Sequence, residues 1–271
     1  MVCIMVVVVK VGGRALEKNI DGIVADIADI GKRERVIFVH GGGDIVTEVS
    51  KKLGVEPKFV MSPEGIRSRY TDEKELDVYV MVMAGKINKQ IVSKLIALGT
   101  QAIGITGADG PTLIAERKKR IVIVDERGRK RVIDGGYTGR IVKAEVKLLQ
   151  TLLNSGFTVV VAPIAIDAEG TLLNVDGDQA AYAIATALKV SELIILTDVE
   201  GVIVGGELIK EIKLSEIEKV LANIGPGMNR KVMLAGKAVE EGVKRVVIAS
   251  GVVERPVIKA LSGAGTLVSQ G

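Results

Sequence analysis

Two lysine-and-glycine segments near opposite ends of the chain carry the side chains best suited to chemistry. Lys10 precedes Gly12 and Gly13 at the end of an apolar run, and Lys231 closes the segment 225–231, which reads Gly-Pro-Gly-Met-Asn-Arg-Lys. Glycine lets backbone N–H groups approach an anion without interference from a Cβ atom, and ammonium groups neutralise the charge of that anion. The combination predicts a site for negatively charged oxygens, as phosphoryl transfer requires.

A second glycine turn, residues 40–43, lies between these segments and contains three consecutive glycines. The first glycine turn can equally be an ordinary tight turn beside a solvated lysine. Three consecutive glycines cost backbone entropy on folding, and a simple turn rarely needs them. The second turn therefore favours a functional role.

The segment 174–178 adds polar side chains to the candidate site. Asn174, Asp176 and Asp178 alternate on an extended segment that enters a helix, and this alternation predicts their side chains on one side. The alternative is an N-cap turn in which Asp178 starts the helix, and both interpretations can hold together. Lys231 is expected in the first turns of another helix, where a lysine opposes the helix dipole and an anionic ligand would offset the penalty.

Several other chemistries are excluded by what the sequence lacks. It has no P-loop motif, no Gly-x-Gly-x-x-Gly after a strand and no Gly-x-Ser-x-Gly elbow. His40 is the only histidine and Cys3 the only cysteine, so nucleophilic triads and histidine-rich metal sites are nearly excluded. We expect His40 to end a strand and hydrogen-bond the turn. A reaction without a protein base fits best, such as attack of an ionised carboxylate on a phosphoryl group.

Strands and helices are expected to alternate along the chain, which is typical of a mainly parallel sheet. The helix after residue 71 is expected to have Asp72 as its cap, Glu75 reaching back to it, and a bend near Gly85. Residues 112–141 have the pattern of short antiparallel hairpins with charged turns. Strands are expected at 3–11, 36–39, 101–106, 158–162, 193–196, 245–249 and 266–268, and helices at 19–30, 45–53, 72–98, 146–154, 178–188, 214–224 and 231–241.

Composition bounds the size, compartment and partners of the protein. The 271 residues suffice for one large domain or two small ones, and 48% of them are hydrophobic. A single cysteine forms no internal disulfide, which favours a reducing cytosol, and the first apolar run is too short to span a bilayer. The net charge is +4, with basic residues concentrated at 117–120 and 127–131. These charges form either a solvated hairpin or a surface for an acidic partner; aromatic residues are only 3% of the chain, which disfavours single-stranded nucleic acid.

Six motifs in order resemble the amino acid kinase family, and within it the acetylglutamate kinases. The resemblance covers nearly the whole chain. The motifs are Val-Lys-Val-Gly-Gly (9–13), Val-His-Gly-Gly-Gly (39–43), Arg-Tyr-Thr-Asp (69–72), Leu-Asn-Val-Asp-Gly-Asp-Gln (173–179), Leu-Thr-Asp-Val-Glu-Gly-Val (196–202) and Gly-Pro-Gly-Met-Asn-Arg-Lys (225–231). The resemblance implies a three-layer αβα sandwich with a mainly parallel central sheet and two lobes, residues 1–165 for substrate and residues 166–271 for ATP, in a cytoplasmic homodimer.

The resemblance also implies the role of each site residue. Lys10 and Lys231 would stabilise the transferring phosphoryl group, and Asp178 would orient these two lysines. The substrate would be held by Gly42, Gly43, Arg69 and Asn174. ATP, with Mg²⁺ and without a dedicated protein metal site, would be held by Gly12, Gly13, Thr197, Asp198, Gly201, Gly227 and Met228.

Two segments, 65–74 and 107–111, look unlike typical acetylglutamate kinases. They resemble a branch whose substrate, α-aminoadipate or glutamate, is tethered to an acidic amino-group carrier protein (LysW) in lysine or arginine synthesis. The basic segments would suit that carrier, and spacing favours Arg69 over Arg67 as the substrate contact. Because the chain begins at its first strand, we expect no extra N-terminal helix of the kind that mediates arginine sensitivity in some relatives.

Three alternatives remain open at this point. The protein could phosphorylate free N-acetylglutamate, or bind nucleotide as a non-catalytic regulator, or bind nucleic acid through its basic hairpin. The presence of both lysines together with Asp178 argues against the regulator, since a regulator would be expected to lose one of the lysines.

Overall fold

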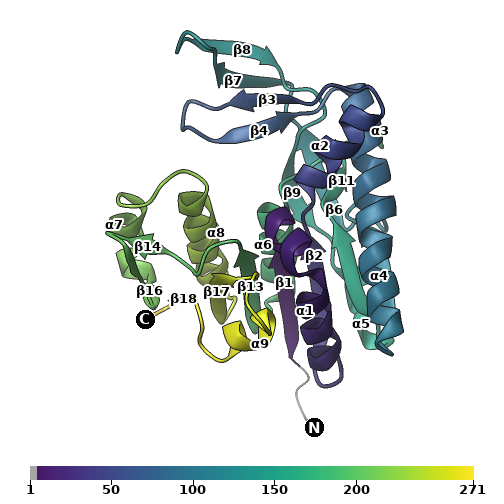
Figure 1. The fold of residues 1–271 in the computed structure, drawn as a ribbon, viewed down its shortest axis with the longest axis vertical. Helices are drawn as coiled ribbons and strands as arrows, with labels where there is room; N and C mark the ends of the chain where they lie inside the picture. Colours follow the sequence, from purple (N-terminus) through teal and green to yellow (C-terminus); the bar gives the residue numbers. More distant parts are fainter. Residues whose placement is uncertain (1–4) are drawn as a thin grey trace.

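A computed structural model describes residues 5–271, and its centre is an eight-stranded sheet. The strand order is β16-β18-β17-β13-β1-β2-β10-β5, and all paired neighbours run parallel except β17 and β18 (Figure 1). The predicted start of the first strand, including Cys3, lies outside the described residues. The strands of this sheet are β1 (Val6–Val11), β2 (Arg35–His40), β5 (Ala102–Thr106), β10 (Thr158–Ala162), β13 (Glu192–Thr197), β16 (Glu211–Lys213), β17 (Arg245–Ser250) and β18 (Thr266–Ser269).

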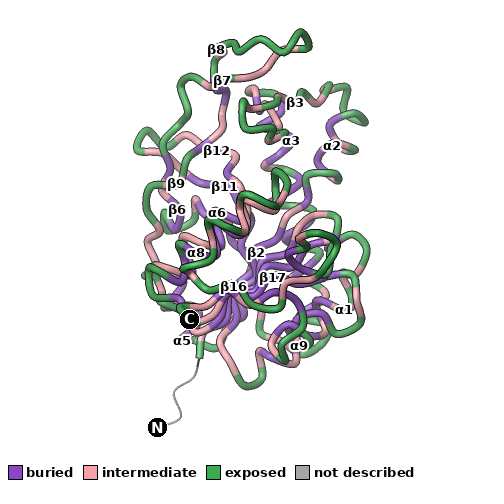
Figure 2. Tube along the Cα trace, turned by 90° about the vertical axis from the view of Figure 1, so that its left-hand side faces the viewer, coloured by how far each residue is buried: buried purple, intermediate pink, exposed green. Residues whose placement is uncertain are grey.

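Helices cover both faces of this sheet and form two hydrophobic cores with it. One face packs against α1, α4 and α9, and the other against α5, α6 and α8. The central strands are rich in Val and Ile and are buried (Figure 2). A parallel sheet with helices on both faces requires strands that are apolar on both sides. This arrangement confirms the predicted three-layer αβα sandwich. The helices are α1 (Gly13–Gly31), α2 (Gly43–Lys52), α3 (Glu73–Val80), α4 (Asn88–Ala97), α5 (Lys147–Asn154), α6 (Gly177–Leu188), α7 (Ile217–Leu221), α8 (Met228–Glu240) and α9 (Pro256–Leu261).

The long helix predicted at 72–98 is three consecutive pieces. The N-cap is Asp72, whose Oδ1 accepts the N–H of Glu75 at 3.0 Å, as predicted. A π-helical turn, Met81–Ile87, joins α3 to α4 and includes Gly85, where a bend was expected. The other half of the predicted capping box is wrong, because the carboxylate of Glu75 pairs with Arg69 and not with the backbone of Asp72.

Two smaller sheets accompany the central one. In Figure 1 the sheet that contains β3, β4, β7 and β8 stands at one end of the molecule, where β7 and β8 project beyond β3 and β4. The two smaller sheets have the orders β12-β11-β6-β9 and β4-β3-β7-β8. The antiparallel pair β7–β8 is a hairpin of the predicted kind, and β6 pairs antiparallel with β9 across it. Their strands, with the separate pair β14–β15, are β3 (Lys58–Met61), β4 (Arg67–Tyr70), β6 (Leu113–Arg117), β7 (Arg120–Val124), β8 (Lys130–Asp134), β9 (Gly139–Ala144), β11 (Ile164–Ile166), β12 (Leu172–Asn174), β14 (Ile203–Val204) and β15 (Glu207–Leu208).

The central sheet runs without interruption across the predicted lobe boundary. Strands β1, β2, β5 and β10 come from residues 1–165, and β13, β16, β17 and β18 from residues 166–271. The division into a substrate lobe and an ATP lobe therefore stays a prediction. Among residues 5–271, no helix has the length and apolar character needed to cross a membrane.

Candidate active site

The candidate catalytic residues gather at the edge of the sheet where the parallel strands end. Lys10 is the penultimate residue of β1, which lies between β13 and β2 in the middle of the sheet. Asp178 is in the first turn of α6, and this helix packs on β1. Lys231 is in the first turns of α8, which packs on α6. Ligands of open α/β sheets bind at this edge.

Asp178 forms ion pairs with both lysines. Lys10 Nζ lies 2.6 Å from Asp178 Oδ1, and the ammonium of Lys231 donates to Asp178 Oδ2. The side chains of Lys10 and Asp178 are each 8% exposed, so the pairs are shielded from solvent. Gly177 makes this approach possible, because a Cβ atom there would lie 3.3 Å from Cε of Lys10. The structure thus brings together the three residues predicted to be catalytic.

The electrostatics of this cluster keep Asp178 ionised. Burial alone would raise the pKa of the Asp178 carboxyl, but Lys10 and Lys231 outweigh burial and hold that pKa well below its usual range. Burial lowers the pKa of Lys231, Lys10 lowers it further, and Asp178 opposes both effects. Two ammonium groups face one carboxylate, which leaves an excess positive charge at a buried point. An anion of the phosphate class would neutralise this excess.

The two glycine turns pack directly against each other beside this cluster. A Cβ atom on Gly13 would lie 3.0 Å from the backbone nitrogen of Gly42. Gly42 has φ of 154°, and its Cβ atom would lie 2.1 Å from Cδ1 of Ile87, so no other residue fits there. The N–H of Gly12 donates to the carbonyl of Leu196 at 3.0 Å. The N–H group of Gly12 is therefore already bonded within the fold. Gly13 and Gly43 begin helices, and the first N–H groups of a helix have no partner within it.

His40 is fully buried at the end of β2, as expected for a strand-end residue that bonds the turn. Burial lowers its pKa to about 4, so the imidazole is neutral near pH 7. Nδ1 lies 3.1 Å from the carbonyl of Gly41, and Nε2 lies 3.4 Å from Nδ2 of Asn88. A neutral ring satisfies both contacts when Nδ1 carries the proton and Nε2 accepts. His40 thus bonds the glycine turn as a neutral ring.

Arg69 and Asn174, the side chains predicted to hold substrate, are both hydrogen-bonded within the protein. Arg69 Nη2 donates to the carbonyl of Gly43 at 2.6 Å. Asn174 Nδ2 donates at 2.8 Å to the hydroxyl of Thr71, two residues after Arg69. Arg67 instead stacks on the ring of Phe59, with 3.7 Å from its Cζ atom to the ring centroid. The structure thus places Arg69, and not Arg67, beside the second glycine turn.

Four of the residues predicted to bind nucleotide lie at the end of β13 or at the start of α8, and a fifth, Gly201, has a packing role. Thr197 is the last residue of β13 and Asp198 follows it at the same sheet edge, with the Thr197 hydroxyl donating to Asp198 Oδ1 at 3.2 Å. Gly227, with φ of 93°, is the N-cap of α8, and Met228 is the first residue of that helix. Gly201 is buried, and a Cβ atom there would lie 2.7 Å from Oγ1 of Thr266. A packing requirement accounts for Gly201 without any ligand.

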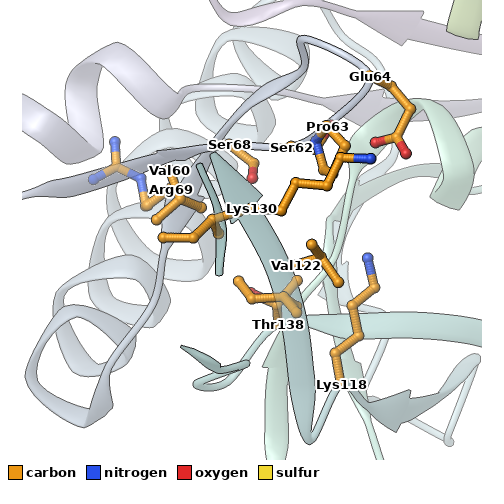
Figure 3. A pocket seen from close by; sticks show the side chains of 12 residues that line it. Val60, Ser62, Pro63, Glu64, Ser68, Arg69, Lys118, Val122, Lys130 and Thr138 are labelled. Atoms are coloured by element: carbon orange, nitrogen blue, oxygen red, sulfur yellow. The ribbon is translucent and has the colours of Figure 1, made fainter. Parts of the chain in front are cut away.

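A cavity of about 570 Å³ lies within the projecting sheet β4-β3-β7-β8. Figure 3 shows the guanidinium of Arg69 pointing away from the ammonium groups of Lys118 and Lys130. The stem of Arg69 thus borders this cavity while its charged end faces the glycine turn. The lining residues are Val60, Ser62, Pro63, Glu64, Ser68, Arg69, Lys118, Ile121, Val122, Ile123, Lys130 and Thr138.

The donor set suits a polyphosphate better than a dedicated metal cage. Within residues 5–271, no three His, Cys, Asp or Glu side chains gather as a metal site requires. Mg²⁺ is usually held by one or two carboxylates together with substrate phosphates, so it needs no such cage. Asp198 is suitably placed: burial raises the pKa of its carboxyl, but hydrogen bonds from its own N–H and from Thr197, and then Arg14, lower it overall.

Sequence reasoning missed several residues that shape the site. Arg14 lies 3.5 Å from Asp198 and 3.7 Å from Asp44, and it links the two glycine turns to the end of β13. Arg230 lies 3.6 Å from Asp176. Arg230 precedes Lys231 and Asp176 lies two residues before Asp178, so the Lys231–Asp178 pair could have indicated the Arg230–Asp176 pair. The contacts of Glu75 and Thr47 with Arg69 had no signal in the sequence, because they depend on tertiary structure.

Comparisons with known proteins find similarity over nearly the whole chain. The model of the amino acid kinase family matches residues 5–250. A LysW-aminoadipate/LysW-glutamate kinase of Sulfurisphaera tokodaii is 56% identical over 263 residues, which cover 97% of this chain and 99% of that protein. The enzyme of the same name from Saccharolobus solfataricus is 54% identical over 266 residues, covering 98% and 100%.

Solved structures share the fold at lower sequence identity. N-acetylglutamate synthase from Neisseria gonorrhoeae superposes with a TM-score of 0.82 at 24% identity, and the match covers 98% of this chain and 60% of that one. Carbamate kinase from Giardia lamblia superposes with a TM-score of 0.71 at 18% identity and covers 99% of both chains. These two likenesses establish the fold alone.

Proposed function

The chain belongs to the amino acid kinase family, and on that premise we propose that it phosphorylates the side-chain carboxylate of α-aminoadipate or glutamate joined to an amino-group carrier protein. It is a phosphotransferase that uses ATP, and the product is an acyl phosphate. Similarity above 50% to LysW-aminoadipate/LysW-glutamate kinases over almost the entire chain supports the choice of acceptor. The observation that carries the proposal is the Lys10–Asp178–Lys231 cluster at the carboxyl edge of the sheet.

The chemistry assigned to this cluster is stabilisation of charge. The acceptor carboxylate is ionised near pH 7 and needs no protein base to attack phosphorus. As the bond to the leaving phosphate breaks, negative charge spreads over the transferring group and the leaving oxygens. Lys10 and Lys231 supply two ammonium groups for that charge, and Asp178 holds both in fixed positions. Buried, preorganised charges of this kind lower the barrier without reorganisation during the reaction.

Nucleotide binding is assigned to the other residues at this edge. Gly13, Thr197 and Asp198 would lie along the phosphates, and Gly227 and Met228 at the start of α8 would border the nucleotide. Mg²⁺, when bound, would neutralise part of the charge of the phosphates. Asp198 is the carboxylate best placed to face that cation, since its pKa is lowered and Thr197 orients it.

Substrate binding is assigned to the opposite side of the cluster. Gly42 and Gly43 would direct backbone N–H groups at the reacting carboxylate. Arg69 and Asn174 would hold the α-side of the amino acid, where the free α-carboxylate and the amide to the carrier lie. The Asn174–Thr71 hydrogen bond and the Arg69–Gly43 hydrogen bond join these groups into one surface, which supports the assignment.

The carrier protein is proposed to dock on the projecting sheet. The cavity of about 570 Å³ is lined by Lys118 and Lys130 and is bordered by the stem of Arg69. The β7–β8 hairpin adds exposed basic residues, of which Arg129 and Arg131 share Asp125 as an ion-pair partner. Arg127 and Lys130 form no ion pair among the described residues. These remaining charges suit an acidic carrier.

The experiment that tests the proposed function is trapping of the acyl phosphate with hydroxylamine. The protein is incubated with ATP and Mg²⁺ and with carrier-linked aminoadipate, carrier-linked glutamate, or free N-acetylglutamate. We expect hydroxamate from the carrier-linked substrates and little from the free one. Robust turnover of free N-acetylglutamate would assign the protein to the acetylglutamate kinases, and absence of hydroxamate from every substrate would refute the kinase assignment.

A further inference from the structure

Arg69 is held in place from several sides by other residues of the chain. Its side chain is 8% exposed. Nη2 donates to the carbonyl of Gly43 at 2.6 Å and to the hydroxyl of Thr47 at 2.5 Å. Nη1 donates to Oε1 of Glu75. The guanidinium therefore ties β4 to the first turn of α2 and to the start of α3.

Glu75 is the only charged partner of Arg69 in the described part of the chain. The residue is 2% exposed, and its Oε2 atom has no hydrogen-bond partner among the described residues. A buried carboxylate is costly unless it is paired, so the pair with Arg69 must compensate for its burial. Ordinary helix capping does not explain this residue, because its side chain does not reach the backbone of Asp72.

Thr47 completes the arrangement from α2. Its hydroxyl donates to the carbonyl of Gly43 at 3.0 Å and accepts from Arg69. Both groups thus meet at Gly43, the residue that begins α2 beside the second glycine turn. In the described part of the chain, Nε–H of Arg69 makes no hydrogen bond. The protein thus fixes the guanidinium through its two terminal nitrogens alone.

From this geometry we propose that Glu75 is a positioning residue, which holds Arg69 against Gly43 so that the guanidinium is preorganised for the α-carboxylate of the substrate. The inference deepens the proposed function and rests on it. A free arginine would have to be ordered when substrate binds, and that ordering weakens binding. Fixing Arg69 during folding removes this cost from the binding step. Glu75 acts through Arg69 and does not touch the substrate.

The test compares Glu75→Gln, Arg69→Ala and the double variant, with Glu73→Gln as the matched control. Glu73 lies on the same helix and is exposed, so the control removes the same charge without touching Arg69. We expect Glu75→Gln to raise KM for the loaded carrier roughly tenfold, with kcat within about threefold and KM for ATP unchanged. The double variant should match Arg69→Ala alone, because Glu75 has no effect without Arg69. Glu73→Gln should behave as wild type.

Two results would overturn this inference. The first is that Glu75→Gln and Arg69→Ala multiply in their effect on KM, which would show that Glu75 acts independently. The second is that Glu75→Gln lowers Tm and changes KM for ATP and for the carrier alike, as a merely structural residue would. If Glu75→Gln does not fold, Thr47→Val decides, and it should raise KM for the carrier by roughly threefold with Tm unchanged; an unaltered KM would refute the inference.

Failure of the proposed function would look different. If wild type forms no acyl phosphate on any substrate, the function itself is wrong. If wild type forms acyl phosphate but Arg69→Ala leaves KM for the loaded carrier unchanged, the function stands and the role of Arg69, and with it that of Glu75, falls.

Discussion

Lys10 and Lys231 contact the two oxygens of a single carboxylate, that of Asp178, although they lie near opposite ends of the chain. The sheet accounts for this meeting. The first strand, β1, lies in the middle of the sheet, and α6 packs on it and against α8. Lys10 and the helices carrying Asp178 and Lys231 therefore share one edge. One carboxylate cannot neutralise two ammonium groups, and this excess of positive charge is what the proposed phosphoryl site uses.

Replacing Lys10 or Lys231 with Ala is the direct test of this relationship. Each change removes one of the two charges assigned to the transferring phosphoryl group. We expect kcat to fall roughly 10²-fold or more, as it does when a preorganised donor is removed from a transition state. The fall should be in kcat measured with saturating ATP and saturating loaded carrier.

Lys237→Ala is the matched control for this prediction. Lys237 lies on α8 like Lys231, but it is exposed and has no ion-pair partner among the described residues. Its variant should keep the wild-type kcat. Normal turnover by both the Lys10 and the Lys231 variants would remove these residues from the chemistry.

Gly42→Ala should damage both the fold and substrate binding. Gly42 has a φ angle of 154°, and the added methyl group would overlap Cδ1 of Ile87 at 2.1 Å. Ile87 is fully buried and cannot move freely, so the turn itself must shift. We expect a loss of about 1–3 kcal/mol in the free energy of unfolding and a raised KM for the loaded carrier.

Gly85→Ala separates this effect from glycine replacement in general. A Cβ atom on Gly85 would meet nothing within 4 Å, and its φ angle is not positive. That variant should be as stable as wild type, or slightly more stable, because alanine restricts the unfolded chain. Equal stability of the two variants, measured by urea unfolding, would show that the Gly42 turn is not strained by a side chain.

The sequence was sufficient for those features that depend on local pattern or on contiguous motifs. The β-branched runs predicted the buried strands, and the layered fold follows from their alternation with helices. The Lys10, Asp178 and Lys231 cluster was expected because each residue stands in a glycine-rich or polar motif. Their roles in the reaction stay predictions until the variants are measured.

Features that depend on distant contacts could not be predicted. The short helix α9 begins where the N–H groups of Val257 and Ile258 donate to Asp26 at 2.9 and 3.2 Å. Asp26 lies on α1, more than two hundred residues earlier in the chain. Strands β3 and β4 were missed because each has only four residues and none of them is fully buried, so no apolar alternation marks these strands. Glu75 was assigned to a capping box because its spacing from Asp72 fits one, but the guanidinium of Arg69 is a stronger partner for a buried carboxylate.

Neutralising the projecting hairpin should weaken use of the carrier alone. The variant is Arg120→Gln, Arg127→Gln and Lys130→Gln, three exposed cations without ion-pair partners in the described range. We expect KM for the loaded carrier to rise roughly tenfold at low salt, with kcat and KM for ATP unchanged, because such charges mainly speed encounter. The difference from wild type should shrink as salt is raised.

A control with the same loss of charge tests whether position matters. Replacing Lys18, Lys237 and Lys244 with Gln removes three exposed cations far from the hairpin in sequence. If this control raises KM for the carrier as much as the hairpin variant does, net charge and not a docking surface explains the effect.

The buried His40 should make the protein less stable in mild acid. Its pKa is about 4 in the folded protein and near 6.5 when unfolded, so the unfolded chain binds a proton that the folded one excludes. The stability due to the neutral ring is complete above pH 6.5 and is lost as pH falls towards 4. The lost free energy of unfolding is about 3 kcal/mol over that range.

His40→Asn keeps a donor near the carbonyl of Gly41 but does not titrate, so its stability should fall less between pH 7 and 4 in urea unfolding. Carboxylates that titrate near pH 4 affect both proteins equally, and the difference between the two slopes therefore isolates His40. Identical slopes would show that the imidazole is not kept neutral by burial, and its support of the glycine turn would then need another explanation.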